Sequence, residues 1–149
     1  MELRARLVED MKAAMKAGEA GRTQLAVIRL ARAAVQNAEI EKLRPLTDDE
    51  VKEVLGREVR QRKDAAEEYR RLGRADRAGT LEAEIRILQA YLPEELDEAQ
   101  LRTIAAEVIA QMGAASPADL GKVMGPLMAR VKGRADGRLV NAVVRELLA

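Results

Sequence analysis

Apolar residues recur every three or four positions along almost the whole chain, and no stretch shows the strict alternation of a half-buried strand. This pattern predicts an all-α protein. We expect an N-terminal four-helix unit followed by a compact C-terminal three-helix unit.

Four helices are predicted in residues 1–92. The first ends at Gly18, a natural helix terminator, and the second runs from about Thr23 to just before Pro45. A capping box at residues 47–50 starts the long third helix, because a Thr hydroxyl and a Glu carboxylate three residues later bind each other's main-chain amides. The fourth helix follows a glycine and is stopped by a proline. The apolar positions expected to face inward are Leu3, Leu7, Met11, Met15, Leu25, Ile28, Val35, Val51, Val54, Leu55, Val59, Leu81, Ile85, Leu88 and Leu92.

A short acidic segment, residues 93–97, is the predicted boundary between a domain of residues 1–92 and a domain of residues 93–149. A second capping box at residues 97–100 starts the fifth helix, which ends at Gly113. The sixth helix is expected to begin at a Ser-Pro pair, which supplies an N-cap and a proline at the first helical position. The inward positions here are Leu101, Ile104, Val108, Met112, Leu120, Val123, Met124, Leu127, Val131, Leu139, Val140, Val143, Val144 and Leu147.

The composition excludes several kinds of chemistry. The 149 residues contain no Cys and no His, so thiolate nucleophiles, imidazole bases and the most common metal ligands are absent. Neither a phosphate-binding Gly-Lys-Ser/Thr loop nor a strand-borne dinucleotide motif is present. We therefore expect no catalytic residue, no metal site and no cofactor. The lack of a long apolar run predicts a cytoplasmic protein without a membrane span.

Charge is unevenly distributed over the last third of the chain, although the net charge of the whole is only +1. Residues 93–117 hold one cation and five carboxylates, whereas residues 118–149 hold six cations and three carboxylates. Arginine and lysine contact phosphates, and glycines let main-chain amides approach closely. The candidate phosphate contacts are Lys122, Lys132, Arg134 and Arg138.

The same segment also has a simpler interpretation as a tight turn between helices. Gly133 then ends one helix, Asp136 caps the next, and the cations are solvated. Composition alone favours this interpretation over a binding site.

Two features of the sixth helix concern its packing. Gly121 and Gly125 have the small-xxx-small spacing that permits close helix packing, which we expect here. Pro126 lies inside the helix, where its ring crowds the carbonyl of Lys122, so a kink is predicted between these two residues.

A second basic cluster lies on the third helix. We expect its cations to form ion pairs along a solvated face with carboxylates at neighbouring helical positions. The cations are Arg57, Arg60, Arg62 and Lys63, and the carboxylates are Glu53, Glu58, Asp64, Glu67 and Glu68.

Six short blocks of the sequence carry a family resemblance. They are Leu30 with residues 37–40, residues 46–50, 60–65, 84–93 and 119–125, and residues 132–137 with 140–141. Taken in this order, they resemble the GatB/YqeY family, and specifically its free-standing YqeY-like members, over essentially the whole chain. The last two blocks are the most specific.

Proteins of this family resemble the C-terminal tail of the B subunit of the aspartyl/glutamyl-tRNA amidotransferase, an all-helical part that contacts tRNA. The resemblance therefore implies a non-catalytic tRNA-binding or tRNA-amidation accessory protein. The residues that it implicates are Lys122, Lys132, Arg134 and Arg138 for RNA contact, and Gly121, Gly125, Gly133 and Gly137 for packing and turn geometry.

Two alternatives stay open. In the first, the chain is a component of a glutamine-dependent amidotransferase, which is a carbon–nitrogen ligase, and acts with other subunits. In the second, it is a helical protein-interaction module. The partners that the resemblance implies are tRNA, amidotransferase subunits or an aminoacyl-tRNA synthetase.

Overall fold

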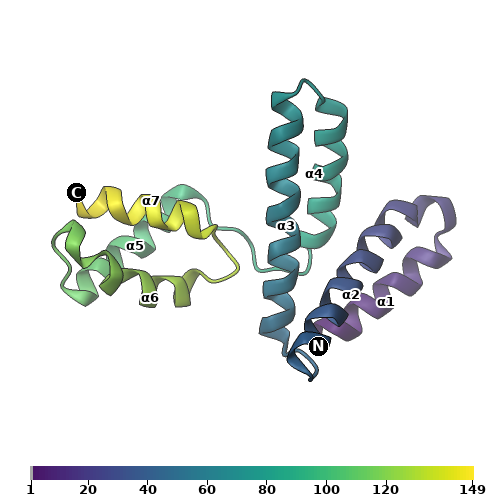
Figure 1. The fold of residues 1–149 in the computed structure, drawn as a ribbon, viewed down its shortest axis with the longest axis horizontal. Helices are drawn as coiled ribbons and strands as arrows, with labels where there is room; N and C mark the ends of the chain where they lie inside the picture. The colour runs from purple at the N-terminus through teal and green to yellow at the C-terminus, as the bar shows by residue number, and fades with distance from the viewer. Residues whose placement is uncertain (1) are drawn as a thin grey trace. The chain divides into compact units, whose positions relative to one another are not determined.

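The computed structural model describes residues 2–149, and all regular structure in this range is helical (Figure 1). Seven α-helices and two short 3-10 turns account for it, which confirms the predicted all-α fold. The helices form two compact units, one ending at Leu92 and the other spanning Pro93–Ala149, each with its own apolar core. None of the helices in the described range combines the length and the apolar character needed to cross a lipid bilayer.

The first unit consists of two helical hairpins. α1 (Leu3–Lys16) and α2 (Arg22–Lys42) are joined by a short 3-10 turn, whereas α3 (Asp48–Arg71) and α4 (Ala75–Gln89) form a longer hairpin (Figure 1). Gly21 in the first connection lies very close to α1, since a Cβ there would be 2.3 Å from a carbonyl oxygen of that helix. Only glycine fits this close approach.

The core of the first unit is built by all four helices. Its largest fully buried side chains include Leu7 from α1, Ile28 from α2, Leu55 from α3 and Leu88 from α4. Burying one such side chain contributes about 1.5–3 kcal/mol to the free energy of unfolding. The two hairpins are therefore held together by shared apolar contacts.

Tyr91 connects the end of α4 to α1. Its ring is buried, its hydroxyl donates a hydrogen bond to the carboxylate of Asp10, and the guanidinium of Arg6 lies 4.5 Å from the ring centroid. Burial, followed by the hydrogen bond to Asp10, raises the pKa of Tyr91 well above the usual value of 10.0. No local motif predicts this contact, because its partners are 81 positions apart.

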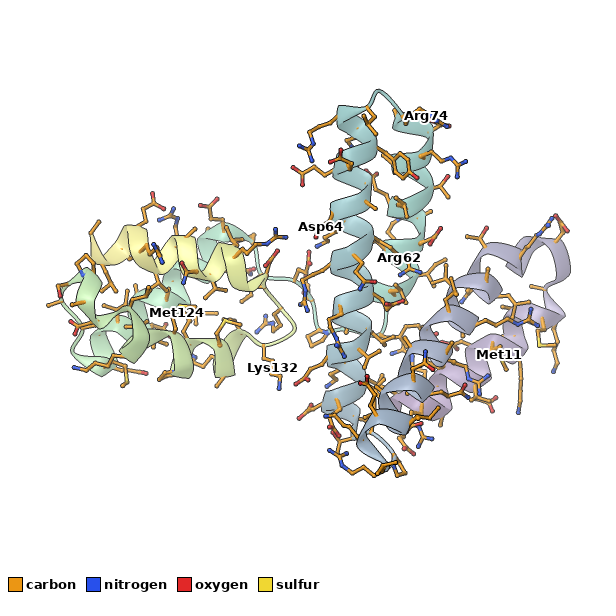
Figure 2. All side chains as sticks on the ribbon, viewed as in Figure 1. Met11, Arg62, Asp64, Arg74, Met124 and Lys132 are labelled. Atoms are coloured by element: carbon orange, nitrogen blue, oxygen red, sulfur yellow. The ribbon has the colours of Figure 1, made fainter. Side chains whose placement is uncertain are left out.

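The part of the α3–α4 hairpin farthest from this core contains little apolar surface. Its buried side chains are Ala66 and Ala78, both small. Arg62 of α3 donates a 3.0 Å hydrogen bond to Glu84 of α4 (Figure 2), and a second arginine–glutamate pair connects the two helices nearer the tip. Close alanine contacts and ion pairs therefore hold this part of the hairpin.

The capping box predicted at the start of α3 is present. Thr47 Oγ1 accepts from the amide of Glu50 at 3.2 Å, and Glu50 Oε1 accepts from the amide of Thr47 at 3.0 Å. The Glu50 carboxylate also accepts from Arg44, at 2.7 Å, and from Lys42. The bond from Arg44, followed by that from Lys42, holds the pKa of Glu50 well below its usual 4.5.

The second unit is a three-helix bundle of α5 (Glu98–Met112), α6 (Leu120–Val131) and α7 (Gly137–Leu148) (Figure 1). All three helices contribute to its core. The fully buried side chains are Leu101, Ala105, Val108, Val123, Leu127, Val131, Val140, Val143 and Val144.

The predicted boundaries of α5 are confirmed. Asp97 Oδ1 accepts from the amide of Gln100 at 2.7 Å, Gln100 Oε1 accepts from the amide of Asp97 at 3.1 Å, and Gly113 ends the helix with φ +65°. The Ser-Pro pair that follows starts a 3-10 turn, Pro117–Asp119, and α6 begins only at Leu120. The sixth helix therefore starts three residues later than predicted.

Four residues predicted to face the core lie partly at the surface. Met15 is 52% exposed, Met112 37%, Leu139 39% and Leu147 38%. The two methionines occupy the last turns of α1 and α5, and in α7 the buried side chain of the last turn is Leu148 instead. Apolar spacing identifies a helix face, but tertiary packing decides how much of that face a neighbour covers.

Candidate nucleic-acid interface

A type II β-turn follows directly after α6. Lys132 has φ −52° and ψ 126°, Gly133 has φ +76°, and the amide of Arg134 donates to the carbonyl of Val131 at 2.8 Å. This turn type requires a positive φ at its third residue, which glycine provides without strain. We call residues 132–138, which connect α6 to α7, the basic turn. Lys132 lies exposed at its corner (Figure 2).

The basic turn includes Asp136, the N-cap of α7, and the first two residues of that helix. Asp136 Oδ1 accepts from the amide of Arg138 at 2.9 Å, and the guanidinium of Arg138 lies 3.5 Å from the other oxygen of the same carboxylate. A Cβ at Gly137 would make only ordinary contact with Met128, so space does not require glycine there. The exposed Arg138 side chain thus extends from the first turn of α7, where the helix dipole adds positive potential.

Arg134 has a structural role that the sequence did not indicate. Its Nε donates to the carbonyl of Glu94 at 3.2 Å, and its own carbonyl accepts from the amide of Leu96 at 2.8 Å. These two bonds hold the segment before α5 against the basic turn. Arg134 is therefore only half-exposed, unlike the other three predicted contacts.

Lys122 lies in the first turn of α6. Its exposed side chain forms no hydrogen bond or ion pair within residues 2–149. The carboxylate of the nearby Asp119 accepts from the amide of Ala115 at 2.9 Å. This bond, a second bond from the amide of Ser116 and the charge of Lys122 lower the pKa of Asp119. Lys122 is thus the least engaged of the four predicted contacts.

The close packing predicted at Gly121 and Gly125 is wrong for this chain. Both residues are exposed, and a Cβ added to either would find no atom within 4 Å. Gly125 has a local explanation instead, because it precedes Pro126 in a continuous helix. The proline ring disfavours helical geometry at the preceding residue partly through a clash with Cβ, which glycine lacks. α6 continues to Val131, and the predicted kink stays a prediction.

The remaining cations of the second unit differ in their partners. Arg102 pairs with Glu146 from α7, and Arg130 donates to Glu107 at 3.0 Å. Arg145 forms no hydrogen bond or ion pair among the residues that the structure describes. Arg102 and Arg130 thus pair with carboxylates outside the basic turn, which itself carries three cations and one carboxylate.

The second basic cluster, on α3, follows its prediction only in part. Arg62 donates to the Glu58 side chain at 3.4 Å and to Glu84 at 3.0 Å. Arg57 and Arg60 form no ion pair within the described part of the chain, so the prediction is wrong for these two residues.

A pocket of about 100 Å³ lies between α1 and α2. Its charged lining is engaged in holding the helices together: Arg4 pairs with Glu39 at 3.2 Å, and Arg32 donates to the sulfur of Met11 at 3.2 Å (Figure 2). Residues 2–149 contain no group of three or more side chains placed to hold a metal ion. Both arginines of the pocket are thus engaged with side chains of α1 and α2.

These features define a helical protein whose second unit presents a basic, glycine-dependent turn between two helices. The profile of the YqeY family, described as Yqey-like protein, matches residues 4–148, which is nearly the whole chain. The chain therefore belongs to the YqeY family. No curated protein sequence matches it significantly.

Proposed function

We propose that this protein is a non-catalytic tRNA-binding accessory protein, which contacts RNA phosphates through the basic turn. The observation that carries the proposal is the geometry of that turn. Gly133 holds Lys132 at an exposed corner, and Arg138 follows at the start of α7. The turn and the helix start fix the main chain at both cations, so less conformational entropy is lost on binding a phosphate backbone than for cations on a flexible loop.

The kind of RNA follows from what the second unit lacks. Both tyrosines of the chain, Tyr69 and Tyr91, belong to the first unit, and there is no Phe or Trp. Without aromatic rings, the second unit has no platform on which unpaired bases stack. Contacts to phosphates of a folded, double-helical RNA fit it better. The family resemblance to a tRNA-contacting tail points to tRNA within that class.

Arg134 takes a secondary place in this proposal. Because its Nε and carbonyl bind Glu94 and Leu96, it supports the turn from within, and reversing its charge would disturb both folding and binding. Lys132, Arg138 and Lys122 are the cleaner positions for a test.

The test is a filter-binding titration of total tRNA at 50 mM salt. We expect Lys132→Glu and Arg138→Glu each to weaken binding several-fold, and the double variant by at least about tenfold, since each reversal replaces a phosphate contact by a repulsion. The matched control is Arg145→Glu, which reverses one exposed charge on the same unit away from the turn. Single-stranded poly(U) should bind more weakly than tRNA.

Two results would overturn the proposal. One is the absence of tRNA binding at low salt. The other is an equal loss of affinity in Arg145→Glu and Lys132→Glu, because binding would then follow overall charge rather than the basic turn.

A further inference from the structure

α2 carries an apolar stripe on the face opposite its core contacts. Its buried residues, which include Ile28 and Val35, face the other helices of the first unit. On the opposite side, Leu30 is 56% exposed and Ile40 is 70% exposed. The α2 stripe comprises Ala26, Leu30, Ala33, Asn37 and Ile40, all of which are exposed.

The spacing of the α2 stripe is that of a coiled-coil seam. Successive members are separated by four, three, four and three residues, which is the alternation of a and d positions in a heptad repeat. Single exposed leucines are normal on a protein surface. Two large apolar side chains aligned on one exposed helix face, with small or polar residues between them, form a surface that can pack against another helix.

The stripe is also nearly palindromic about residue 35. Reversing the helix direction around that point exchanges Leu30 with Ile40 and Ala33 with Asn37. Two copies related by a two-fold axis would therefore place a large side chain opposite a large one at each end. The small residues in the middle let the two backbones approach. An isologous interface requires this kind of self-complementarity.

The residues that flank the stripe follow the same symmetry. Arg29, Gln36 and Leu43 repeat every seven residues along one edge, and the two-fold axis would bring Gln36 beside Gln36 of the second copy. A side-chain amide both donates and accepts, so it can pair with its own copy. Arg29, which forms no ion pair within residues 2–149, would lay its aliphatic stem over Leu43 of the second copy.

Leu43 is an independent sign that this edge is covered. It is 90% exposed, and its φ of +56° makes it the one non-glycine residue with positive φ in the described chain. Glycine or asparagine usually occupies this position after a helix. A leucine there costs both backbone strain and apolar exposure, and a covering partner would offset the second cost.

We propose that the chain forms a homodimer through α2, with two copies packed antiparallel around a two-fold axis near residue 35. The stripe extends over about 21 Å of helix at 1.5 Å per residue. Such a contact lies near the lower end of stable interfaces, about 1,200 Å² in total. The dimer should therefore dissociate in the micromolar range. It uses the first unit and is independent of RNA binding by the second.

The primary test is sedimentation equilibrium of the full chain from 1 µM to about 1 mM. Wild type should shift from monomer to dimer, and Leu30→Glu should raise the dissociation constant at least tenfold. Leu72→Glu is the matched control, because Leu72 is 66% exposed but belongs to the tip of the α3–α4 hairpin. Circular dichroism melting should show all variants folded, since the substituted side chains are exposed.

A charge exchange tests the antiparallel register. In the proposed dimer, Leu30→Glu/Ile40→Lys places opposite charges against each other, whereas Leu30→Glu/Ile40→Glu places like charges together. The first double variant should dimerise more tightly than the second by at least tenfold. A parallel pairing would instead put Glu beside Glu and Lys beside Lys, and neither variant would recover.

Spin labels give the geometry directly, because the chain has no native cysteine. In an antiparallel pair, labels at Gln36→Cys lie near the axis and should be close together. Labels at Thr23→Cys should be separated along the helix by about 36 Å at 1.5 Å per residue. A chain that is monomeric at about 1 mM, a dimer unaffected by Leu30→Glu, or equal short distances at both sites would overturn the proposal.

Discussion

The guanidinium of Arg134 donates a hydrogen bond from Nε to the main-chain carbonyl of Glu94, at 3.2 Å. The bond spans 40 residues of sequence and connects the basic turn to the segment that enters α5. A cation that resembles a phosphate contact in the sequence thus helps to shape the surface on which its neighbours lie. Stability and binding can be separated by choosing variants with this contact in mind.

Arg134→Ala should lower the stability of the second unit. Loss of the bond to Glu94 leaves a main-chain carbonyl without this donor, which costs about 1 kcal/mol of unfolding free energy. Urea unfolding measures the change, and hydrogen exchange at the amide of Leu96 should accelerate. Arg145→Ala, which removes a cation without a partner, should leave both quantities unchanged.

Two glycines of the second unit should respond in opposite ways to alanine. Gly133→Ala forces a Cβ into a φ of +76° and should lower the unfolding free energy by about 1 kcal/mol. Gly121→Ala lies in α6 with open space around it and should raise the unfolding free energy by about 0.5–1 kcal/mol through helix propensity. Equal effects in urea unfolding would contradict the type II turn.

The carboxylate of Glu50 should make the first unit sensitive to acid. Its pKa is held well below 4.5 in the folded chain, chiefly by Arg44 and then by Lys42. A folded-state pKa below the unfolded value stabilises the protein above the unfolded pKa, and this contribution disappears as the pH falls toward the folded value. The melting temperature of Glu50→Gln should therefore lie below that of wild type at pH 7, and the gap should narrow progressively as the pH falls below about 4.5. A gap of the same size at pH 5 and pH 3 would point to a cause other than the ion pairs.

Tyr91 should resist ionisation in the folded chain. Burial and the hydrogen bond to Asp10 raise its pKa well above 10.0. In Tyr69→Phe, the single remaining tyrosine reports Tyr91 alone, and its phenolate absorbance should be missing at pH 10.5 until a denaturant is added. Adding Asp10→Asn to Tyr69→Phe removes the carboxylate that accepts the hydrogen bond from Tyr91. Tyr91 should then ionise at a lower pH than in Tyr69→Phe alone.

Salt dependence tests the phosphate contacts that we propose for the basic turn. Each neutralised phosphate contributes about 0.7–0.9 to the slope of log affinity against log salt. Lys132→Gln/Arg138→Gln should therefore reduce the slope for tRNA by about 1.5, and Lys122→Gln by less than one further unit. Arg145→Gln should leave it unchanged; a slope that is the same in all variants would place the RNA contact elsewhere.

The helices were predictable because their signals are local. The capping boxes at Thr47 and Asp97 consist of bonds between residues three positions apart, and both are present. The sequence also places Gly125 directly before Pro126, which is an equally local signal. The four-residue spacing between Gly121 and Gly125 predicted close helix packing instead. Both glycines have open space around them, so packing does not explain them, and Pro126 offers a local explanation for Gly125 alone.

The contacts that the sequence did not reveal join distant residues. Nothing near Arg134 indicates Glu94, and nothing near Tyr91 indicates Asp10. The exposure of Met15 and Leu147 likewise depends on where neighbouring helices end. Within the candidate site, the residue types and the turn could be predicted from local sequence, whereas the division between supporting and exposed cations required the structure.

The α3–α4 hairpin has two parts that differ in what holds them. Near α1 and α2 it shares the apolar core, but toward its tip it relies on alanine contacts and on ion pairs such as Arg70 with Glu82. Apolar burial gives cooperative stability, whereas exposed ion pairs weaken with salt. The tip is therefore expected to open and close as a small local unfolding unit while the core remains intact. Proteolysis and hydrogen exchange should detect this opening first at the connection between α3 and α4. The free energy of this local opening should lie far below that of global unfolding.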